Sequence, residues 1–146
     1  MTATIAETLE RALGSTLEIA RAFPDDRLDF WPAPNMKTVA EQIEHLAHNL
    51  EYVVEPVAAL YDHSSQISPS SDPVPRLERA VARVNAVMAA VPDGDWVREA
   101  GYPGDFKMSI LKAALVMLEH DTHHRGQLIV ALRILGIDPP KRWQSS

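Results

Sequence analysis

Cysteine is absent from the 146-residue sequence, and this absence limits the chemistry available to the protein. No disulfide framework, thiolate metal site or cysteine nucleophile is possible, so any metal ligand must be a nitrogen or oxygen atom. Basic residues are also few, because 14 lysines and arginines stand against 20 acidic residues and give a formal charge of −6. They form no cluster that follows a phosphate backbone, so we expect no nucleic-acid partner.

Long apolar runs are missing as well. No segment approaches the roughly 20 apolar residues that a membrane span requires. The N-terminal stretch MTATIAETLERALGS carries Glu7 and Glu10 and lacks the basic and apolar regions of a secretory signal. We therefore expect a soluble, cytoplasmic protein with no membrane partner. A chain of this length can bury one core without metal or disulfide staples, and we predict a single domain over residues 1–146.

Strand signals are nearly absent, because no alternating apolar run is bounded by hairpin turns. Apolar residues instead recur at three- and four-residue steps in four segments, which start near residues 4, 37, 75 and 109 and predict four helices. The second begins with a capping-box pair, Thr38 and Glu41, and Pro56 should kink or end it. The fourth ends before Gly136. We predict an all-α four-helix bundle with long connections, in which residues 63–75 form a polar loop and residues 92–107 hold at most a short irregular segment.

The fourth segment is apolar on nearly every side. One row of it is formed by Leu111, Leu115, Leu118, Ile129 and Leu132. A helix of this kind needs neighbours on both sides, either partner helices or a second subunit, and we predict a homodimer that buries this row. Within the same helix, Gly126 suggests the close approach of a neighbouring backbone, and Arg125 should pair with an acidic group such as Glu119 or Asp121.

Titratable residues gather in the middle of this apolar helix, in LEHDTHHRGQ (118–127). His120 and His124 are four positions apart and so share one helix face, which also carries Gln127 and faces the bundle interior. A buried histidine bonded to a carbonyl or carboxylate is the alternative for either residue alone. Two imidazoles at this spacing can instead bind one metal ion.

A third ligand has to come from a neighbouring helix, and EQIEHLAHNLEY offers His45 and His48. His45 shares a polar stripe with Gln42, and a solvated helix face is the alternative explanation of that stripe. Three protein nitrogens with coordination positions left open are the ligand set of a catalytic metal site, whereas a structural site would require a fourth protein ligand.

The segments EHLAHNLEY and HDTHHRGQLIVALRILG, with the PP that follows, resemble the DinB/YfiT-like metalloenzyme family. The resemblance spans essentially the whole chain, including DFWPAPNMKTVAEQIEHLAHN. It implies a four-helix bundle with a metal held by His45, His120 and His124, and leaves His48 and His123 near the site. Gln127 is a further candidate for orienting a ligand.

Relatives in this family include bacillithiol-, mycothiol- and glutathione-dependent transferases. The resemblance therefore implies a divalent metal, zinc first and nickel, iron or manganese as alternatives, and a low-molecular-weight thiol as cofactor. The first hypothesis is a transferase that joins such a thiol to a small electrophilic substrate. The alternatives are a metal-dependent hydrolase and a non-catalytic metal-binding stress or sensor protein. The resemblance also agrees with a homodimer.

Overall fold

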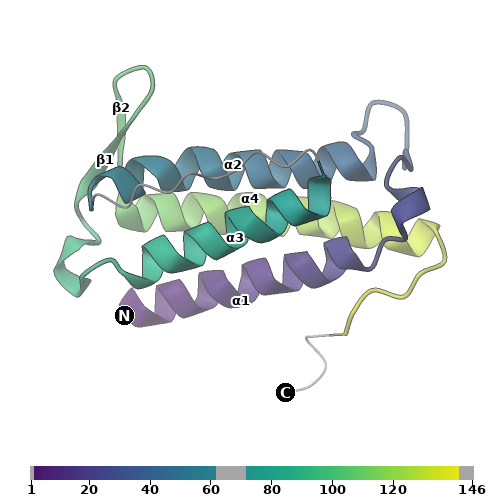
Figure 1. Cartoon of the computed structure of the whole chain (residues 1–146), viewed down its shortest axis with the longest axis horizontal. Coiled ribbons are helices and arrows are strands. Elements are labelled where there is room, and N and C mark those ends of the chain that lie inside the picture. The colour runs from purple at the N-terminus through teal and green to yellow at the C-terminus, as the bar shows by residue number, and fades with distance from the viewer. Residues whose placement is uncertain (1, 62–71, 142–146) are drawn as a thin grey trace.

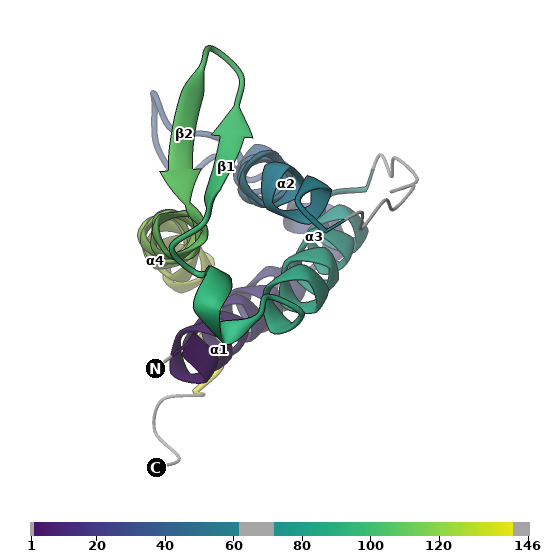
Figure 2. The ribbon, with the colours of Figure 1, turned by 90° about the vertical axis from the view of Figure 1, so that its left-hand side faces the viewer.

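Four helices form a bundle, which confirms the predicted all-α fold (Figure 1). The computed structural model describes residues 2–61 and 72–141. The helices are α1 (Thr2–Arg21), α2 (Val39–Ala59), α3 (Pro73–Ala89) and α4 (Ile110–Ile134). Both α1 and α2 pack against α3 and α4, so that the helices enclose one core, as the end-on view in Figure 2 shows. None of the described helices is long and apolar enough to cross a membrane.

The directions of the helices follow from their side-chain pairs. Arg76 of α3 bonds to Glu51 of α2, and Arg83, two turns later, bonds to Glu55. The residue number rises in both helices from the first pair to the second, so α2 and α3 run parallel. Figure 1 shows α1 running opposite to both of them and α4 running opposite to α2. Most of the loop predicted for 63–75 lies outside the described residues, but its last three residues already belong to α3, because the helix begins at Pro73.

Local signals explain where the helices begin and end. The predicted capping box is confirmed, because Glu41 N–H donates to Thr38 Oγ1 at 3.2 Å and Thr38 N–H donates to Glu41 Oε2 at 2.8 Å. Ser109 caps α4 in the same way through the N–H of Lys112. Pro56 does not end α2, which continues to Ala59.

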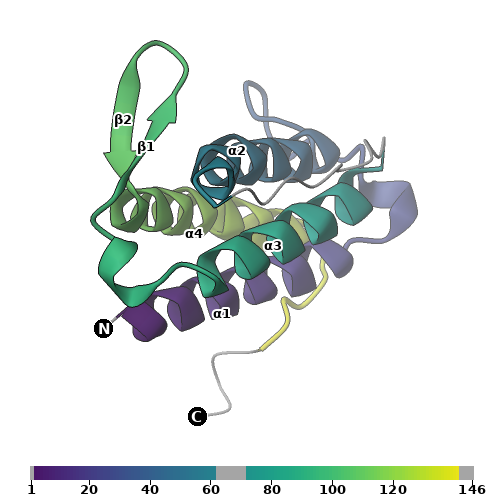
Figure 3. The same ribbon diagram turned by 60° about the vertical axis from the view of Figure 1, so that its left-hand side comes forward.

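The segment between α3 and α4 contains a β-hairpin, so the expectation of at most an irregular segment at 92–107 was wrong. Strands β1 (Glu99–Tyr102) and β2 (Phe106–Ser109) pair antiparallel, with Tyr102 opposite Phe106. The turn between them holds Gly104 and Asp105, both at positive φ. Tyr102 O–H donates to the carbonyl of Val53 at 2.8 Å and fastens the hairpin to α2. Figure 3 shows the hairpin projecting from the end of the bundle where α4 begins.

Helix α4 is less completely buried than its apolar composition suggested. Ala113, Met117, Leu128 and Leu132 are buried in the core. Leu115, Val130 and Ile134 are exposed by 50%, 50% and 57%. The assignment of Leu132 to an outer row was wrong, because its side chain is 0% exposed. In the remaining row, Leu111, Leu118 and Ile129 are partly buried against the core, and Leu115 is half exposed.

Candidate metal site

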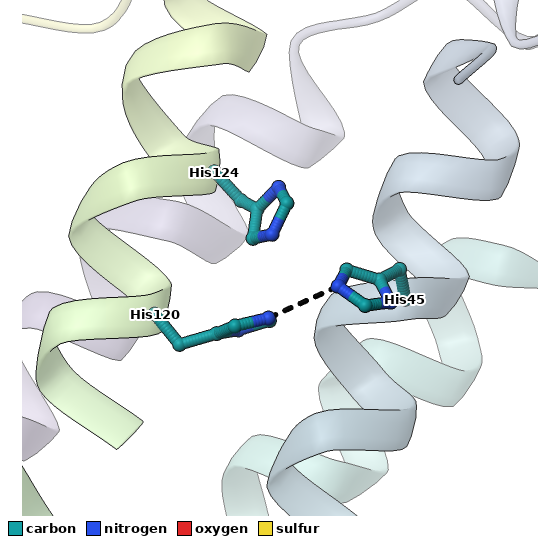
Figure 4. A group of neighbouring side chains, drawn as sticks. All are labelled: His45, His120 and His124. Carbon is teal, nitrogen blue, oxygen red and sulfur yellow. Dashed lines mark hydrogen bonds between the residues drawn. The ribbon is translucent and has the colours of Figure 1, made fainter. Parts of the chain in front are cut away.

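Three histidines from two antiparallel helices point toward one another (Figure 4). His45 lies in the middle of α2, and His120 and His124 lie one turn apart on α4. The ring centroids of the three pairs are 4.4 to 4.9 Å apart, and His45 Nε2 lies 3.0 Å from His120 Nε2. The structure therefore brings together the three residues singled out in the sequence, and it places His120 and His124 on the face of α4 that meets α2.

The arrangement fits a divalent metal ion. One nitrogen of each of the three rings lies within 4.8 Å of the others. Zinc holds imidazole nitrogens at about 2.0–2.1 Å, which places neighbouring nitrogens about 3.4 Å apart in a tetrahedron. Small side-chain rotations would satisfy that geometry. The set supplies three protein ligands and leaves coordination positions for a small molecule, as a catalytic site requires.

The protonation state of the three rings also suits metal binding. Burial, followed by the charges of His124, His45 and His123, lowers the pKa of His120 to about 4. Burial is likewise the main reason why the pKa of His45 and that of His124 are lowered, and the nearby Lys37 ammonium contributes to both. Neutral imidazoles at pH 7 have a free lone pair for a metal ion, so protonation does not compete with binding there.

Two glutamine side chains orient His124. Its Nδ1 lies 2.9 Å from Gln127 Oε1, and Gln42 Nε2 hydrogen bonds to the same Oε1. A ring bound to a metal through Nε2 carries its proton on Nδ1, and Gln127 Oε1 is the acceptor for that proton. Gln127 Nε2 in turn lies 3.4 Å from His123 Nε2. The prediction for Gln127 thus has a structural basis, whereas the role of Gln42 was missed, although it lies one turn before His45 on the same stripe.

The two remaining histidines lie beside the site. His123 is exposed and its ring packs edge-on against His124, with 4.9 Å between centroids. His48 is exposed on α2, one turn after His45, and its charge contributes to the lowered pKa of that residue. Neither belongs to the converging set, and their role near the site stays a prediction.

A buried ionic network holds α4 against α1 next to the histidines. Asp121 is 1% exposed, and its Oδ1 accepts a 2.6 Å hydrogen bond from Thr16 Oγ1 of α1. Arg125 Nη1 lies 3.3 Å from Asp121 Oδ2 and donates to the carbonyl of Ala12 at 2.9 Å. Arg125 thus pairs with Asp121, one of the partners expected. Because Asp121 directly follows His120, this network fixes the rotation of α4 that aims His120 and His124 at α2.

A cavity of about 170 Å³ opens beside His124. It is lined by Asn35, Met36, Lys37, Gln42, His124 and Gln127. A larger cavity of about 260 Å³ lies between α1 and α3 and is lined in part by Glu7, Glu10 and Trp96, but it contains none of the converging histidines. Of these two cavities, the smaller one has a converging histidine, His124, in its lining.

Residues 8–128 match the family model of the DinB superfamily. The chain belongs to the DinB superfamily. The match includes all three converging histidines and the network that supports them. No curated protein matches the chain.

Solved structures support the same fold for this DinB-superfamily chain. A DinB-like protein from Bacillus subtilis superposes with a TM-score of 0.74 at 17% identity, over 94% of this chain and 96% of that one. A DinB-like protein from Bacillus cereus gives a TM-score of 0.72 at 16% identity, over 95% of each chain. A conserved protein from Enterococcus faecalis gives 0.66 at 15% identity, over 93% of this chain and 98% of that one. At these identities the similarity shows the fold alone.

Proposed function

We propose that the protein is a divalent-metal-dependent enzyme whose metal is held by His45, His120 and His124. The observation that carries this proposal is the convergence of three imidazoles, with lowered pKa values, beside a cavity that reaches solvent. Zinc is the metal we expect first, and nickel, iron and manganese accept the same nitrogen ligands.

The reaction that this site supports best is the transfer of a low-molecular-weight thiol to a small electrophile. A divalent ion bound by three neutral histidines lowers the pKa of a thiol that reaches it, which makes the sulfur nucleophilic near pH 7. The chain has no cysteine, so the thiol must come from a cofactor. The sulfur forms a bond to the electrophilic carbon, the leaving group departs with the bonding electron pair, and the thiol proton passes to solvent.

The residues of the chain have separable roles in this reaction. His45, His120 and His124 hold the ion, and Gln127 keeps Nδ1 of His124 hydrogen-bonded so that Nε2 is available. The small molecules are assigned to the cavity lined by Lys37 and Gln42, because it adjoins His124. This arrangement also agrees with the resemblance of the sequence to thiol-dependent transferases.

Metal content is the first test. Protein purified without a nickel column should contain about one equivalent of a divalent metal by elemental analysis. The double variant His120→Ala/His124→Ala should lose it, and His48→Ala, a change of an exposed histidine on α2, should retain it. Stoichiometric metal in the double variant would overturn the ligand assignment.

Thiol dependence is the second test. Metal-loaded protein is incubated with bacillithiol, mycothiol, glutathione or a simple thiol and a chromogenic haloarene, and product is measured against the uncatalysed reaction. We expect turnover with at least one thiol and its loss in the double histidine variant. Hydrolysis of an ester probe without any thiol would support the hydrolase alternative, and bound metal with neither activity would support a non-catalytic metal-binding protein.

A further inference from the structure

The cavity beside His124 has a lining of unusual charge for this protein. The whole chain carries a formal charge of −6, yet no carboxylate is among the residues that line this cavity. Its polar groups are the ammonium of Lys37, the imidazole of His124 and the side-chain amides of Asn35, Gln42 and Gln127. The amide of Gln42 already donates to Gln127 Oε1. The Lys37 ammonium and the amide N–H groups of Asn35 and Gln127 are hydrogen-bond donors suited to an anionic ligand.

The connection that carries Lys37 is held in place by its own hydrogen bonds. Val39 N–H donates to the carbonyl of Phe30 at 3.0 Å, and Trp31 Nε1–H donates to the carbonyl of Met36 at 2.7 Å. Asn35 adopts a left-handed backbone conformation with φ 68°, which turns the chain just before Lys37. In Figures 1 and 2 this connection lies beside the N-terminal end of α2, on the side where α2 meets α4. The connection therefore forms an ordered wall of the cavity.

The charge of Lys37 is not neutralised by a neighbour. Within residues 2–61 and 72–141, the ion pairs found do not include Lys37. Glu41 is close in sequence, and its carboxylate is held at the N–H of Thr38 in the capping box and forms no ion pair with Lys37 among the described residues.

We propose that Lys37, with the amides of Asn35 and Gln127, binds a carboxylate group of the molecule that reacts at the three histidines. This inference rests on the proposed function and names the class of its substrate. The carboxylate belongs either to the thiol or to the electrophile. The cavity of about 170 Å³ opens to solvent and has room for a carboxylated arm. Lys37 is a specificity-determining residue in this scheme.

The first arm of the test measures binding to cobalt-loaded protein without turnover. The absorption spectrum of the ion reports binding of mercaptosuccinate, a thiol with two carboxylates, and of the uncharged thiol monothioglycerol. The wild type should favour mercaptosuccinate. Lys37→Met should weaken mercaptosuccinate binding by about tenfold or more and leave monothioglycerol unchanged, because a charge-assisted hydrogen bond is lost. Lys37→Arg should keep the preference, and Lys112→Met, a change of an exposed lysine at the start of α4, is the matched control.

The second arm places the carboxylate on the electrophile. The KM for 4-chloro-3-nitrobenzoate and for its uncharged methyl ester is measured with a neutral thiol in the same four proteins. A Lys37-dependent KM for the acid alone assigns the carboxylate to the electrophile, and a Lys37-dependent affinity for mercaptosuccinate alone assigns it to the thiol. Equal behaviour of charged and uncharged ligands in the wild type and Lys37→Met would overturn the proposal.

The two proposals fail in different ways. Succinate, which carries no thiol, is also titrated into metal-free protein by NMR in the wild type and Lys37→Met. Lys37-dependent succinate binding without any thiol turnover would overturn the transferase function and keep the carboxylate site. Thiol turnover that is indifferent to charge would keep the function and overturn the carboxylate site. Circular dichroism checks that Lys37→Met remains folded.

Discussion

Asp121 is a fully buried carboxylate at the centre of the bundle, and its titration should be visible in the stability of the protein. Burial raises its pKa from 3.8 to about 6, although Thr16 and Arg125 act in the opposite direction. Between these two values the folded protein holds a proton that the unfolded chain has released. The contribution of Asp121 to the free energy of unfolding therefore decreases as the pH rises through this window.

Asp121→Asn tests this sign, because asparagine keeps the size of the side chain and does not titrate. In metal-free protein, the free energy of unfolding of the wild type minus that of the variant should decrease between pH 4 and pH 7, by up to about 3 kcal/mol. Urea unfolding at several pH values measures the difference, and subtraction removes the titration of the histidines. The exposed Asp138→Asn serves as control. Parallel curves for the wild type and Asp121→Asn would show that burial does not raise this pKa.

Gln127 should matter for metal affinity although it is not a ligand. Replacing it by alanine removes the acceptor of His124 Nδ1–H, and loss of such a partner typically weakens metal binding about 10- to 100-fold. Competition with a zinc chelator gives the affinity of the wild type and of Gln127→Ala. Thr122→Ala, an exposed change on the same helix, should bind zinc like the wild type. An unchanged affinity in Gln127→Ala would show that this glutamine does not support metal binding.

Two glycines in and after α4 have opposite expected responses to alanine. A methyl group added at Gly126 meets no atom within 4 Å, so the close backbone approach expected there was wrong. Gly126→Ala should stabilise the protein by up to about 1 kcal/mol, because alanine favours a helix interior. Gly136 has φ +77°, and Gly136→Ala should destabilise it by about 1 kcal/mol. Thermal unfolding of both variants, with metal content held equal, measures the two changes in stability. A destabilised Gly126→Ala would show that the added methyl group does not fit at this position.

The elements differ in how far the sequence predicts them. The helices are predictable because their apolar residues repeat over many turns, and Thr38 and Gly136 mark helix ends through local chemistry. The hairpin was missed because each strand has only four residues, and β1 buries only Ala100 and Tyr102. Helix α2 passes Pro56 at the loss of one hydrogen bond, to the carbonyl of Tyr52, which lies on an exposed part of the helix.

The same distinction applies to the site. His120 and His124 could be paired from their spacing alone, because four residues is a fixed relation on one helix. His45 could be chosen over His48 only through the resemblance to a family, since the relative rotation of two helices is a tertiary property. The link from Gln42 to Gln127 joins residues 85 positions apart and carries no local signal. Lys37 is in the cavity wall only because hydrogen bonds fold its connection back onto α2.

At the scale of the whole molecule, the uncovered side of α4 has to be explained. Leu115 is 50% exposed, and Leu111, Leu118 and Ile129 are only partly buried. The segment that carries the hairpin meets this row at the first turn of α4, where Leu111 N–H donates to the carbonyl of Trp96. Leu115, one turn further on, is still 50% exposed. An apolar row of this length along a helix is a typical protein–protein contact surface.

We propose that a second copy of the chain covers this row in a two-fold dimer. A groove of about 140 Å³ between α1 and α4 continues the row, and it is lined almost entirely by apolar and threonine side chains, including Ile5, Leu115 and Leu118. A two-fold axis brings the same surface of the two copies together. The row and the groove of each copy are then buried in one self-complementary interface.

Light scattering at micromolar concentration should give twice the monomer mass for the wild type. Leu118→Glu should shift it to the monomer, because the dimer would have to bury an unpaired carboxylate. Ile134→Glu changes a residue that is 57% exposed on another side of α4, and this variant should remain dimeric. A monomer mass for the wild type would exclude the dimer. Retention of the dimer by Leu118→Glu would place the interface elsewhere. Because Leu118 lies on the same helix as His120 and His124, metal content should be measured in every variant. A monomer that keeps its full equivalent of metal would show that each chain forms its site alone.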